Sequence, residues 1–279
     1  MLCSKTIKVY SINYTQGETW MEANKQNKVK VSGCIVTYNN KEDVEICIDS
    51  ILKYTMGVDL KLYVSDNLST DLTATNIKEK FKDVTVIINN ENNGFGAGHN
   101  VVIDKLDSKY HVIINPDIII DNDVILELVN YMETNPSVGM ITPKILNIDG
   151  SEQYLPKLRP RFKYLLGGRI NALKHYRSEY TMQDVEITKP VEIDFCTGCF
   201  MVIRTDLFKK IRGFDDRYFM YFEDADLTRE VKKSMKVIFY PYAHVYHKWS
   251  RASSKKIKYF IIQVQSMFRY YKKWHMNTD

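Results

Sequence analysis

From residue 28 onward, the apolar positions follow two alternating periods, one typical of buried strands and the other of amphipathic helices. Apolar, β-branched runs predict strands at 29–38, 60–65, 84–88 and 111–114. Helical spacing predicts helices around Val44, Cys47, Ile48 and Ile51, over 70–81, from about 97, and around 125–132. Strands that alternate with helices favour a mostly parallel central sheet covered by helices on both faces, as in Rossmann-like α/β folds.

The regular pattern ends after residue 139. Four turn-forming residues, Pro143, Gly150, Pro156 and Pro160, open a stretch that reads as loop-rich up to 190. Beyond it the pattern predicts a strand pair over 191–204, a helix from about Asp224 and a strand at 236–240. We therefore expect three parts: an extension at 1–27, one α/β domain at 28–250 with halves 28–120 and 121–250, and a helical tail at 251–279. A weak alternation at 7–12 is consistent with an edge strand in the extension.

Composition narrows the class of protein. The chain has 279 residues, 44% hydrophobic and 26% charged, with a net charge of +5, which is ordinary for a soluble globular protein. It contains no run of about 20 apolar residues, and its N-terminus does not resemble a signal peptide. Five cysteines include a single C-x-x-C pair, Cys196 and Cys199, without the second pair that a zinc site needs. These features predict a cytoplasmic protein.

Polar residues follow each of the first four predicted strands. In parallel α/β sheets, ligands bind beyond the carboxyl ends of the strands, so these residues are expected to share one site. Each alone reads as a turn or cap residue, whereas together they favour a ligand. The clusters are Thr37-Tyr38-Asn39, Asp66 with 67–71, Asn93-Gly94 through Gly98 and Asn100, and Asn115-Pro116-Asp117.

The glycines of this series come after the third strand. A dinucleotide fingerprint belongs after the first strand, so their position argues against a dehydrogenase, and against a sugar nucleotidyltransferase for the same reason. Asp117 closes the fourth strand, where a carboxylate suits a hard divalent cation, although a turn or cap role is equally consistent. His247, near Trp249, is a candidate nitrogen ligand for an ion such as Mn²⁺, although a histidine at a strand end is more often structural.

A second cluster places three acids, Glu223, Asp224 and Asp226, directly after an aromatic run at 218–222. Acids in the first turn of a helix are stabilised by its dipole, and this structural interpretation is favoured for Asp226. The aromatic lining indicates a pocket around Glu223 and Asp224. For these two, general-base chemistry is the favoured interpretation.

Together these motifs resemble the family-2 inverting glycosyltransferases of GT-A fold, and specifically the rhamnosyltransferase-like and galactofuranosyltransferase-like members. The resemblance covers 29–273. Residues 34–39 look like the family's first-strand motif, and 93–100 like its Gly-rich turn. Residues 115–117 look like its D-x-D motif, with Asn115 in place of the first aspartate. The segment 213–229 and the late H-x-x-S from His247 to Ser250 also match.

The resemblance implies one-step sugar transfer with Asp224 as general base and Glu223 beside it. A divalent cation (Mn or Mg) would be held by Asp117 and His247. The implied donor-binding residues are Thr37, Tyr38, Asn39, Asp66, Asn93, Gly94, Gly98, Asn100 and Asn115, with Asp66 selecting a pyrimidine base. The implied acceptor-binding residues are Gly198, Tyr221 and Trp249.

The expected donor is dTDP-rhamnose; the alternatives are UDP-galactose in either ring form and UDP-N-acetylglucosamine. The expected acceptor is a growing, lipid-linked cell-surface polysaccharide. A non-catalytic nucleotide-sugar-binding subunit is the alternative of another class. No nucleic-acid-binding motif is present, so a nucleic-acid partner is not expected.

Two stretches, 157–177 and 251–273, each carry seven Lys or Arg and no acid. The second is also rich in aromatic residues. Such a tail is typical of contact with an anionic membrane, here the inner face of the cell membrane, but also of a helix packed on its own domain. The sequence leaves both interpretations open.

Overall fold

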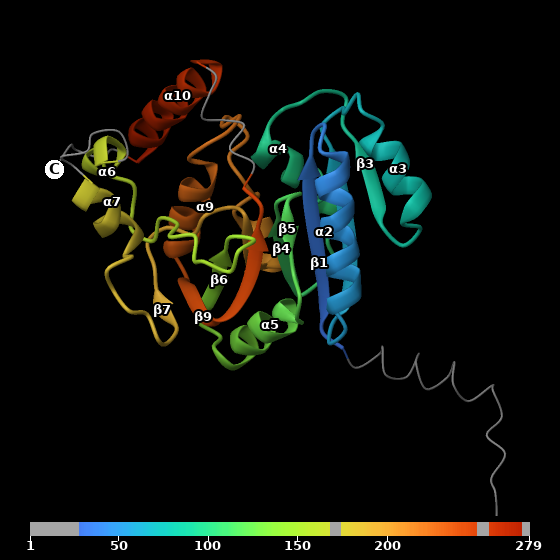
Figure 1. Cartoon of the computed structure of the whole chain (residues 1–279), viewed down its shortest axis with the longest axis horizontal. Helices are drawn as coiled ribbons and strands as arrows, with labels where there is room; N and C mark the ends of the chain where they lie inside the picture. Colours follow the sequence, from blue (N-terminus) through green and yellow to red (C-terminus); the bar gives the residue numbers. More distant parts are fainter. Residues whose placement is uncertain (1–27, 168–173, 250–256, 275–279) are drawn as a thin grey trace, which may run out of the picture.

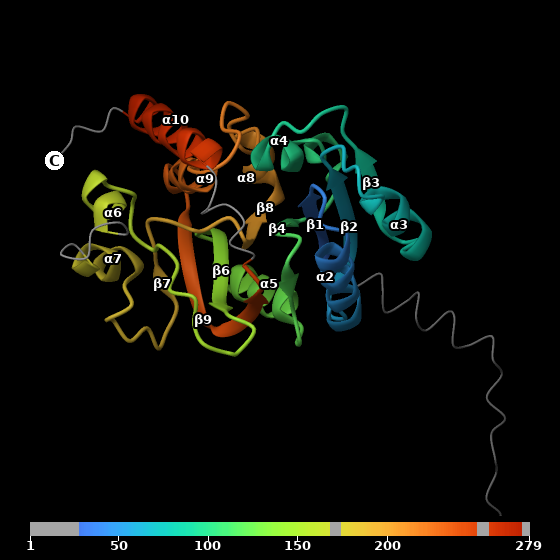
Figure 2. The same cartoon turned by 45° about the horizontal axis from the view of Figure 1, so that its top comes forward.

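The computed structural model describes residues 28–167, 174–249 and 257–274. The predicted edge strand in 1–27 and Ser250 of the H-x-x-S segment lie outside the described residues. The described strands form one nine-stranded mixed sheet in the order β3-β2-β1-β4-β8-β6-β9-β5, and β7 pairs with β9. Helices lie against the sheet on both sides (Figures 1 and 2).

The parallel half of the sheet confirms the predicted strands. Its members are β1 (Lys30–Thr37), β2 (Asp59–Asp66), β3 (Thr85–Ile88) and β4 (Tyr110–Ile114). They pair in parallel register, so their carboxyl ends meet at one edge. Buried β-branched and apolar side chains are concentrated in β1, β2 and β4, which lie inside the sheet, whereas β3 at its edge is only partly buried.

The connecting helices are α2 (Lys41–Tyr54), α3 (Thr73–Lys80), α4 (Phe95–Asn100), a 3₁₀ turn (Ile103–Lys105) and α5 (Val124–Thr134). The predicted apolar stripe of α2 is buried. Helix α3 starts three residues later than predicted. The Asp71 carboxylate accepts a hydrogen bond from the Thr73 N–H, while the Thr70 N–H is bound to Asn39 outside the helix.

The second half adds β5 (Ile118–Ile119), β6 (Val138–Leu146), β7 (Val191–Glu192), β8 (Phe200–Arg204) and β9 (Lys236–His247). The predicted strand pair over 191–204 is wrong as a pair, because β7 joins β9 whereas β8 lies antiparallel between β4 and β6. Strand β6 was not predicted, because Gly139 and Pro143 interrupt it. Both lie at register shifts, where a strand tolerates such residues.

Strand β9 runs seven residues beyond its predicted end, to His247, which pairs with Ile118 of β5. The remaining helices are α6 (Phe162–Gly167), α7 (Lys174–Thr181), α8 (Thr205–Lys210), α9 (Glu223–Lys232) and α10 (Ile257–Lys273). Helix α10 confirms a helix within the predicted tail and lies beside α9 (Figures 1 and 2). None of the described helices has the length and apolar character to cross a membrane.

Candidate functional site

The two acids predicted to act as general base open helix α9. Asp224 accepts a hydrogen bond on Oδ2 from the backbone N–H of Gly198, at 3.0 Å. Its Oδ1 accepts from the N–H of Ala225, at 2.8 Å. Gly198, a predicted acceptor-binding residue two positions before β8, is therefore in direct contact with the predicted base.

Burial sets the protonation of this acidic pair. It raises the pKa of Asp224 to about 6, although backbone hydrogen bonds from Gly198 and Ala225 oppose the rise. Burial, followed by the charge of Asp224, raises the pKa of Glu223 well above its usual value. Glu223 is 7% exposed, and its Oε2 has no hydrogen-bond partner among the described residues. The pair therefore combines Asp224, which ionises at about pH 6, with Glu223, whose buried carboxyl holds its proton to a higher pH than an exposed glutamate does.

The loop before the acids is strained. Tyr221 and Phe222 both have a φ of 70°, a left-handed conformation that is costly for large side chains. Helix α10 supports this loop, since Ser266 Oγ donates to the Met220 carbonyl at 2.8 Å. The rings of Phe222 and Tyr270 lie 5.4 Å apart. Packing against α10 thus helps to hold the conformation that presents Glu223 and Asp224.

Asp226, the third acid, joins α9 to α10. It is 1% exposed and accepts hydrogen bonds from Lys273 Nζ and from Trp274 Nε1, both at 2.7 Å. Burial raises its pKa, while Lys273 opposes the rise. The structure thus gives Asp226 a structural partner in the tail, in addition to its position in the first helical turn.

The two predicted metal ligands lie side by side. His247 Nε2 is 3.2 Å from Asp117 Oδ1, and both side chains are largely buried. Asn115 Nδ2 lies 3.4 Å from the same histidine nitrogen. The described residues contain no cluster of three or more His, Cys, Asp and Glu side chains suited to a metal. A cation at this pair would therefore keep positions for phosphate oxygens and water.

Gln153 determines which nitrogen of His247 carries a proton. Its Nε2 donates to the His247 carbonyl at 2.6 Å, which turns Oε1 toward Nδ1 at 3.1 Å. Nδ1 must then be the N–H donor, so the lone pair of neutral His247 sits on Nε2, facing the Asp117 oxygen. A cation bound by both atoms would offset the repulsion between this lone pair and the carboxylate, which lie 3.2 Å apart. This donor set fits Mn²⁺ or Mg²⁺ with the imidazole favouring Mn²⁺.

The donor side of the edge contains unpaired buried groups. Asp66 is 1% exposed; its Oδ2 accepts from the Ser69 N–H at 2.9 Å, but its Oδ1 has no partner among the described residues. Thr37 Oγ1 is also buried without a partner. Unpaired buried acceptors are costly, so these two atoms favour a ligand that donates hydrogen bonds here.

The turn beside Asp66 is fixed by Asn39. Its Oδ1 accepts from the Thr70 N–H and its own N–H donates to Ser69 Oγ, both at 2.8 Å. Tyr38 stands at the same edge and is 48% exposed, which leaves a ring face open to a base or ribose. The residues from the ends of β1 and β2 thus lie together, as predicted.

The Gly-rich turn contacts protein closely. A Cβ on Gly94 would lie 1.9 Å from the Phe219 carbonyl oxygen, and φ there is +92°. A Cβ on Gly98 would lie 2.7 Å from Val36. These contacts alone require glycine, whereas the predicted approach of the donor stays a prediction.

Two asparagines of this turn have protein partners. Asn100 binds both backbone groups of Phe214, at 2.7 and 2.9 Å, and so fastens α4 to the segment before α9. Asn93 is exposed and donates to Glu91 at 3.1 Å. Their donor contacts stay predictions.

On the acceptor side, Gly198 adjoins the base: a Cβ there would lie 3.3 Å from the Cβ of Asp224. Trp249 is 40% exposed and stacks with His247 at a centroid distance of 6.5 Å. Tyr221 is partly buried in the strained loop. The predicted acceptor residues therefore flank both the acid pair and the metal pair.

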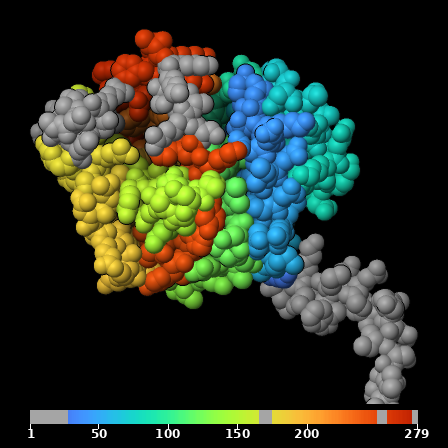
Figure 3. All heavy atoms as spheres, viewed as in Figure 1, coloured from blue at the N-terminus to red at the C-terminus, as the bar shows by residue number. Residues whose placement is uncertain are grey.

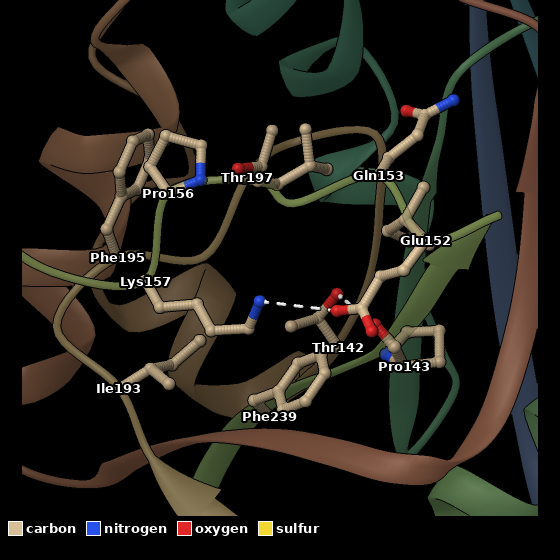
Figure 4. A pocket seen from close by; sticks show the side chains of 12 residues that line it. Thr142, Pro143, Glu152, Gln153, Pro156, Lys157, Ile193, Phe195, Thr197 and Phe239 are labelled. Atoms are coloured by element: carbon tan, nitrogen blue, oxygen red, sulfur yellow. Dashed lines mark hydrogen bonds and ion pairs between the residues drawn. The ribbon is translucent and has the colours of Figure 1, made fainter. Parts of the chain in front are cut away.

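A pocket lies among residues that neighbour these two pairs in the structure or the sequence (Figure 4). It encloses about 300 Å³, part of it open to solvent. Lys157 and Glu152 point toward one another inside it, 3.7 Å apart. Its wall includes Gln153, which holds His247, and Thr197, which precedes Gly198. Burial, and to a smaller extent the charges of Asp117 and Asp224, raises the pKa of Cys199, which precedes β8.

Sequence reasoning missed Gln153 and Lys157. Both lie in the stretch interpreted as loop, and nothing in their spacing marks them. The turn at 147–151 folds the chain back so that the Gln153 N–H donates to the Ile145 carbonyl. The four described cysteines are free and buried.

Comparison with known proteins adds to this geometry. The profile of Glycosyl transferase family 2 matches residues 32–212. Rhamnosyltransferase WbbL of Escherichia coli is 27% identical over 193 residues, covering 63% of this chain and 69% of that protein. An N-acetylglucosaminyl-diphospho-decaprenol L-rhamnosyltransferase of Mycobacterium tuberculosis is 27% identical over 205 residues, covering 67% of this chain and 66% of that protein.

Among solved structures, a mannosyltransferase of Pyrobaculum calidifontis in complex with GDP-Man and Mn²⁺ is similar in fold. Its TM-score is 0.61 at 15% identity, and the match covers 95% of this chain and 71% of that one. At this identity the likeness shows the fold, which is the GT-A arrangement.

Proposed function

Because the chain belongs to glycosyl transferase family 2, we propose that it transfers a sugar, with inversion, from a nucleoside-diphosphate donor to a carbohydrate hydroxyl. The observation that carries this proposal is the buried Asp224 carboxylate. It is held by the Gly198 N–H at the start of α9, with a pKa raised to about 6. A base with such a pKa is ionised at neutral pH and still accepts a proton efficiently.

In the proposed reaction, Asp224 takes the proton from the acceptor hydroxyl as its oxygen attacks the anomeric carbon. The bond from that carbon to the donor phosphate oxygen breaks, and the nucleoside diphosphate leaves. Neutral Glu223 beside the base has a hydrogen to donate to a sugar oxygen, so it orients the substrate. The buried, aromatic-lined surroundings restrict competing water.

A divalent cation fits the pair of Asp117 and His247. When bound, it supplies positive charge against the departing diphosphate. Gln153 keeps the His247 lone pair available on Nε2 for this cation.

For the donor we propose dTDP-rhamnose. The two relatives named above are rhamnosyltransferases, although identity is only 27%. The unpaired Oδ1 of Asp66 is suited to accept the imide N–H of a thymine or uracil base. A UDP-linked galactose, galactofuranose or N-acetylglucosamine is the alternative, because the same contact serves uracil.

For the acceptor we propose a lipid-linked oligosaccharide of the cell surface, met at the inner face of the membrane. The name of the mycobacterial relative states a decaprenol-linked, diphosphate-bearing N-acetylglucosamine. A polyprenyl-linked substrate requires the acceptor side of the enzyme to lie near a bilayer.

The test is a donor screen followed by a transfer assay. Thermal shift with Mn²⁺ across UDP-, dTDP- and GDP-sugars identifies the donor, which should raise the melting temperature most. Release of nucleoside diphosphate is then compared between wild type and Asp224→Asn, which keeps shape and removes basicity. We expect kcat to fall about 10²–10⁴-fold at near-normal donor affinity. Donor binding without turnover in the wild type would instead indicate a non-catalytic nucleotide-sugar-binding subunit.

A further inference from the structure

Helix α10 turns its apolar stripe away from the rest of the protein. Ile257, Ile261 and Phe268 are 80%, 50% and 65% exposed, respectively. They are spaced by four and seven residues, so they lie along one side of the helix. The only buried residues of α10 are Ser266 and Tyr270, on the opposite side. A surface helix of a soluble protein normally does the reverse and buries its apolar stripe.

The inward side is held by polar contacts as well as aromatic packing. Ser266 binds the Met220 carbonyl, and Lys273 and Trp274 both bind Asp226. The orientation of the helix is therefore fixed at several points in its C-terminal half and just after its end. Because the helix is attached in this way, its apolar stripe faces outward. Exposure of such an apolar surface to water is unfavourable, and surfaces of this kind often mark an interaction site.

The apolar surface extends toward α6. Phe162 of α6 is 53% exposed, and Figures 1 and 2 both place α6 at the same end of the molecule as α10. Figure 3 shows α10 at the outside of the molecule at that end. Phe162 is thus a further exposed apolar side chain at the end of the molecule where α10 lies.

Basic residues border this surface. Lys258 and Lys272 are exposed, and helical spacing puts them on the flank of the stripe. Arg161 and Lys163 flank Phe162. The sequence from 251 to 273 has seven Lys or Arg and no acid. Exposed apolar side chains with a basic border match the interfacial region and headgroups of an anionic bilayer.

We propose that the outward stripe of α10, with Phe162, is a docking surface for an anionic lipid membrane. The helix lies in the plane of the interface, inserts Ile257, Ile261 and Phe268 among the acyl chains, and sets its lysines against the headgroups. A second copy of the chain fits this surface less well. A two-fold interface would place the basic flank of one α10 against that of the other.

Docking also orients the catalytic site. One side of α10 faces lipid, while the other supports the strained loop that leads into Glu223 and Asp224. A docked α10 therefore fixes the acceptor side of the site with respect to the bilayer, where a lipid-linked sugar is presented. This use of the surface, unlike the docking itself, rests on the proposed function.

The test is co-flotation of the full chain with vesicles at low salt. One set contains phosphatidylcholine with phosphatidylglycerol, and the other phosphatidylcholine alone. A stripe variant combines Ile261→Ser with Phe268→Ser, and a charge variant combines Lys258→Glu with Lys272→Glu. The matched control is Met56→Ser with Ile148→Ser, two apolar residues that are 67% and 56% exposed elsewhere. Melting temperature and donor hydrolysis without lipid check that each variant is folded.

We expect the wild type and the control to bind the anionic vesicles, and high salt to weaken that binding. The stripe variant should bind about tenfold or more weakly, and the charge variant should lose its preference for phosphatidylglycerol. Wild-type protein that ignores these vesicles, or a stripe variant that binds like the wild type, overturns the proposal. So does a wild type that is dimeric without lipid and becomes monomeric in the stripe variant, since a second copy then covers the stripe. Vesicle binding by a wild type without donor turnover would contradict the proposed function alone.

Discussion

Gln153 holds His247 at two points, donating to its backbone carbonyl at 2.6 Å and lying 3.1 Å from its Nδ1. The two residues are 94 positions apart in the sequence. Their contact turns Nε2 of the histidine toward Asp117. The imidazole lone pair and the carboxylate then face one another, in an arrangement suited to binding a cation. Gln153 therefore supports the candidate metal site by orienting His247, although it is not itself one of the proposed cation ligands.

The first prediction concerns this site. Asp117→Ala should abolish the Mn²⁺-dependent part of donor binding while the protein remains folded. Gln153→Leu should weaken Mn²⁺ binding about 10–100-fold, the usual effect of removing the partner that orients a ligand histidine. Titration of Mn²⁺ followed by electron paramagnetic resonance measures both. Equal Mn²⁺ affinity in the wild type and Asp117→Ala would remove Asp117 from the site.

The second prediction concerns the nucleotide base. Asp66→Ala removes the carboxylate whose Oδ1 is unpaired, so dTDP or UDP should bind more weakly by about 1.5–3 kcal/mol. Calorimetric titration of nucleoside diphosphates measures this change. Asp107→Ala is the control, since Asp107 is an exposed carboxyl that pairs with Lys30 at the start of β1, away from the carboxyl ends of the strands. Equal affinity of the wild type for GDP and UDP would contradict a pyrimidine-selective pocket.

The parallel half of the sheet was predictable because its signals are local. Each strand from β1 to β4 is a short apolar run, and the polar residues at its end are its immediate neighbours in sequence. Parallel pairing then brings Thr37 and Asp66 into register. The fold class follows from the periodicity of apolar residues. The edge of the sheet where the donor is expected follows from the rule that ligands bind beyond the carboxyl ends of parallel strands.

The second half was less predictable because its signals are long-range. Strand β8 inserts antiparallel between β4 and β6, a choice that depends on partners far away in the chain. Strand β6 was not predicted because it contains Pro143, and a proline usually argues against a strand. The pairing of β6 with β9 is irregular at Pro143, and a strand tolerates proline at such a position. The orientation of α10 depends on Asp226, and nothing in the helix itself indicates that its apolar stripe faces outward.

The third prediction concerns the pH dependence of catalysis. Since the pKa of Asp224 is raised to about 6, the base is ionised above that pH and protonated below it. The kcat/KM for donor hydrolysis should therefore be flat above about pH 7 and fall about tenfold per unit below pH 6. Asp224→Asn should remove this acidic limb along with most of the activity. Asp49→Asn, at an exposed ion pair on α2, should leave it unchanged. A wild-type limb centred near pH 4 would assign the base to a carboxyl outside this buried pair.

The last prediction concerns the stability cost of the acidic pair. Glu223 has a pKa raised well above its usual value in the folded protein, so the folded state retains a proton that the unfolded state releases above about pH 4.5. Above that pH the unfolded state binds fewer protons than the folded state. Glu223 therefore lowers the free energy of unfolding as pH rises from about 4.5 toward the pKa of Glu223 in the folded protein. Glu223→Gln removes the titration but keeps the size and the hydrogen-bonding amide.

The difference in unfolding free energy between Glu223→Gln and the wild type should therefore grow, in favour of the variant, between pH 5 and pH 8. Urea denaturation at several pH values, without donor or metal, measures it. Glu179→Gln, at an exposed carboxyl whose pKa is lowered by Lys163, should show no such trend in this range, because that carboxyl is ionised in both the folded and the unfolded state above about pH 5. If Glu223→Gln instead becomes less stable relative to the wild type as pH rises, then the Glu223 carboxylate is stabilised in the folded protein. Its assignment as the neutral partner of Asp224 would be wrong.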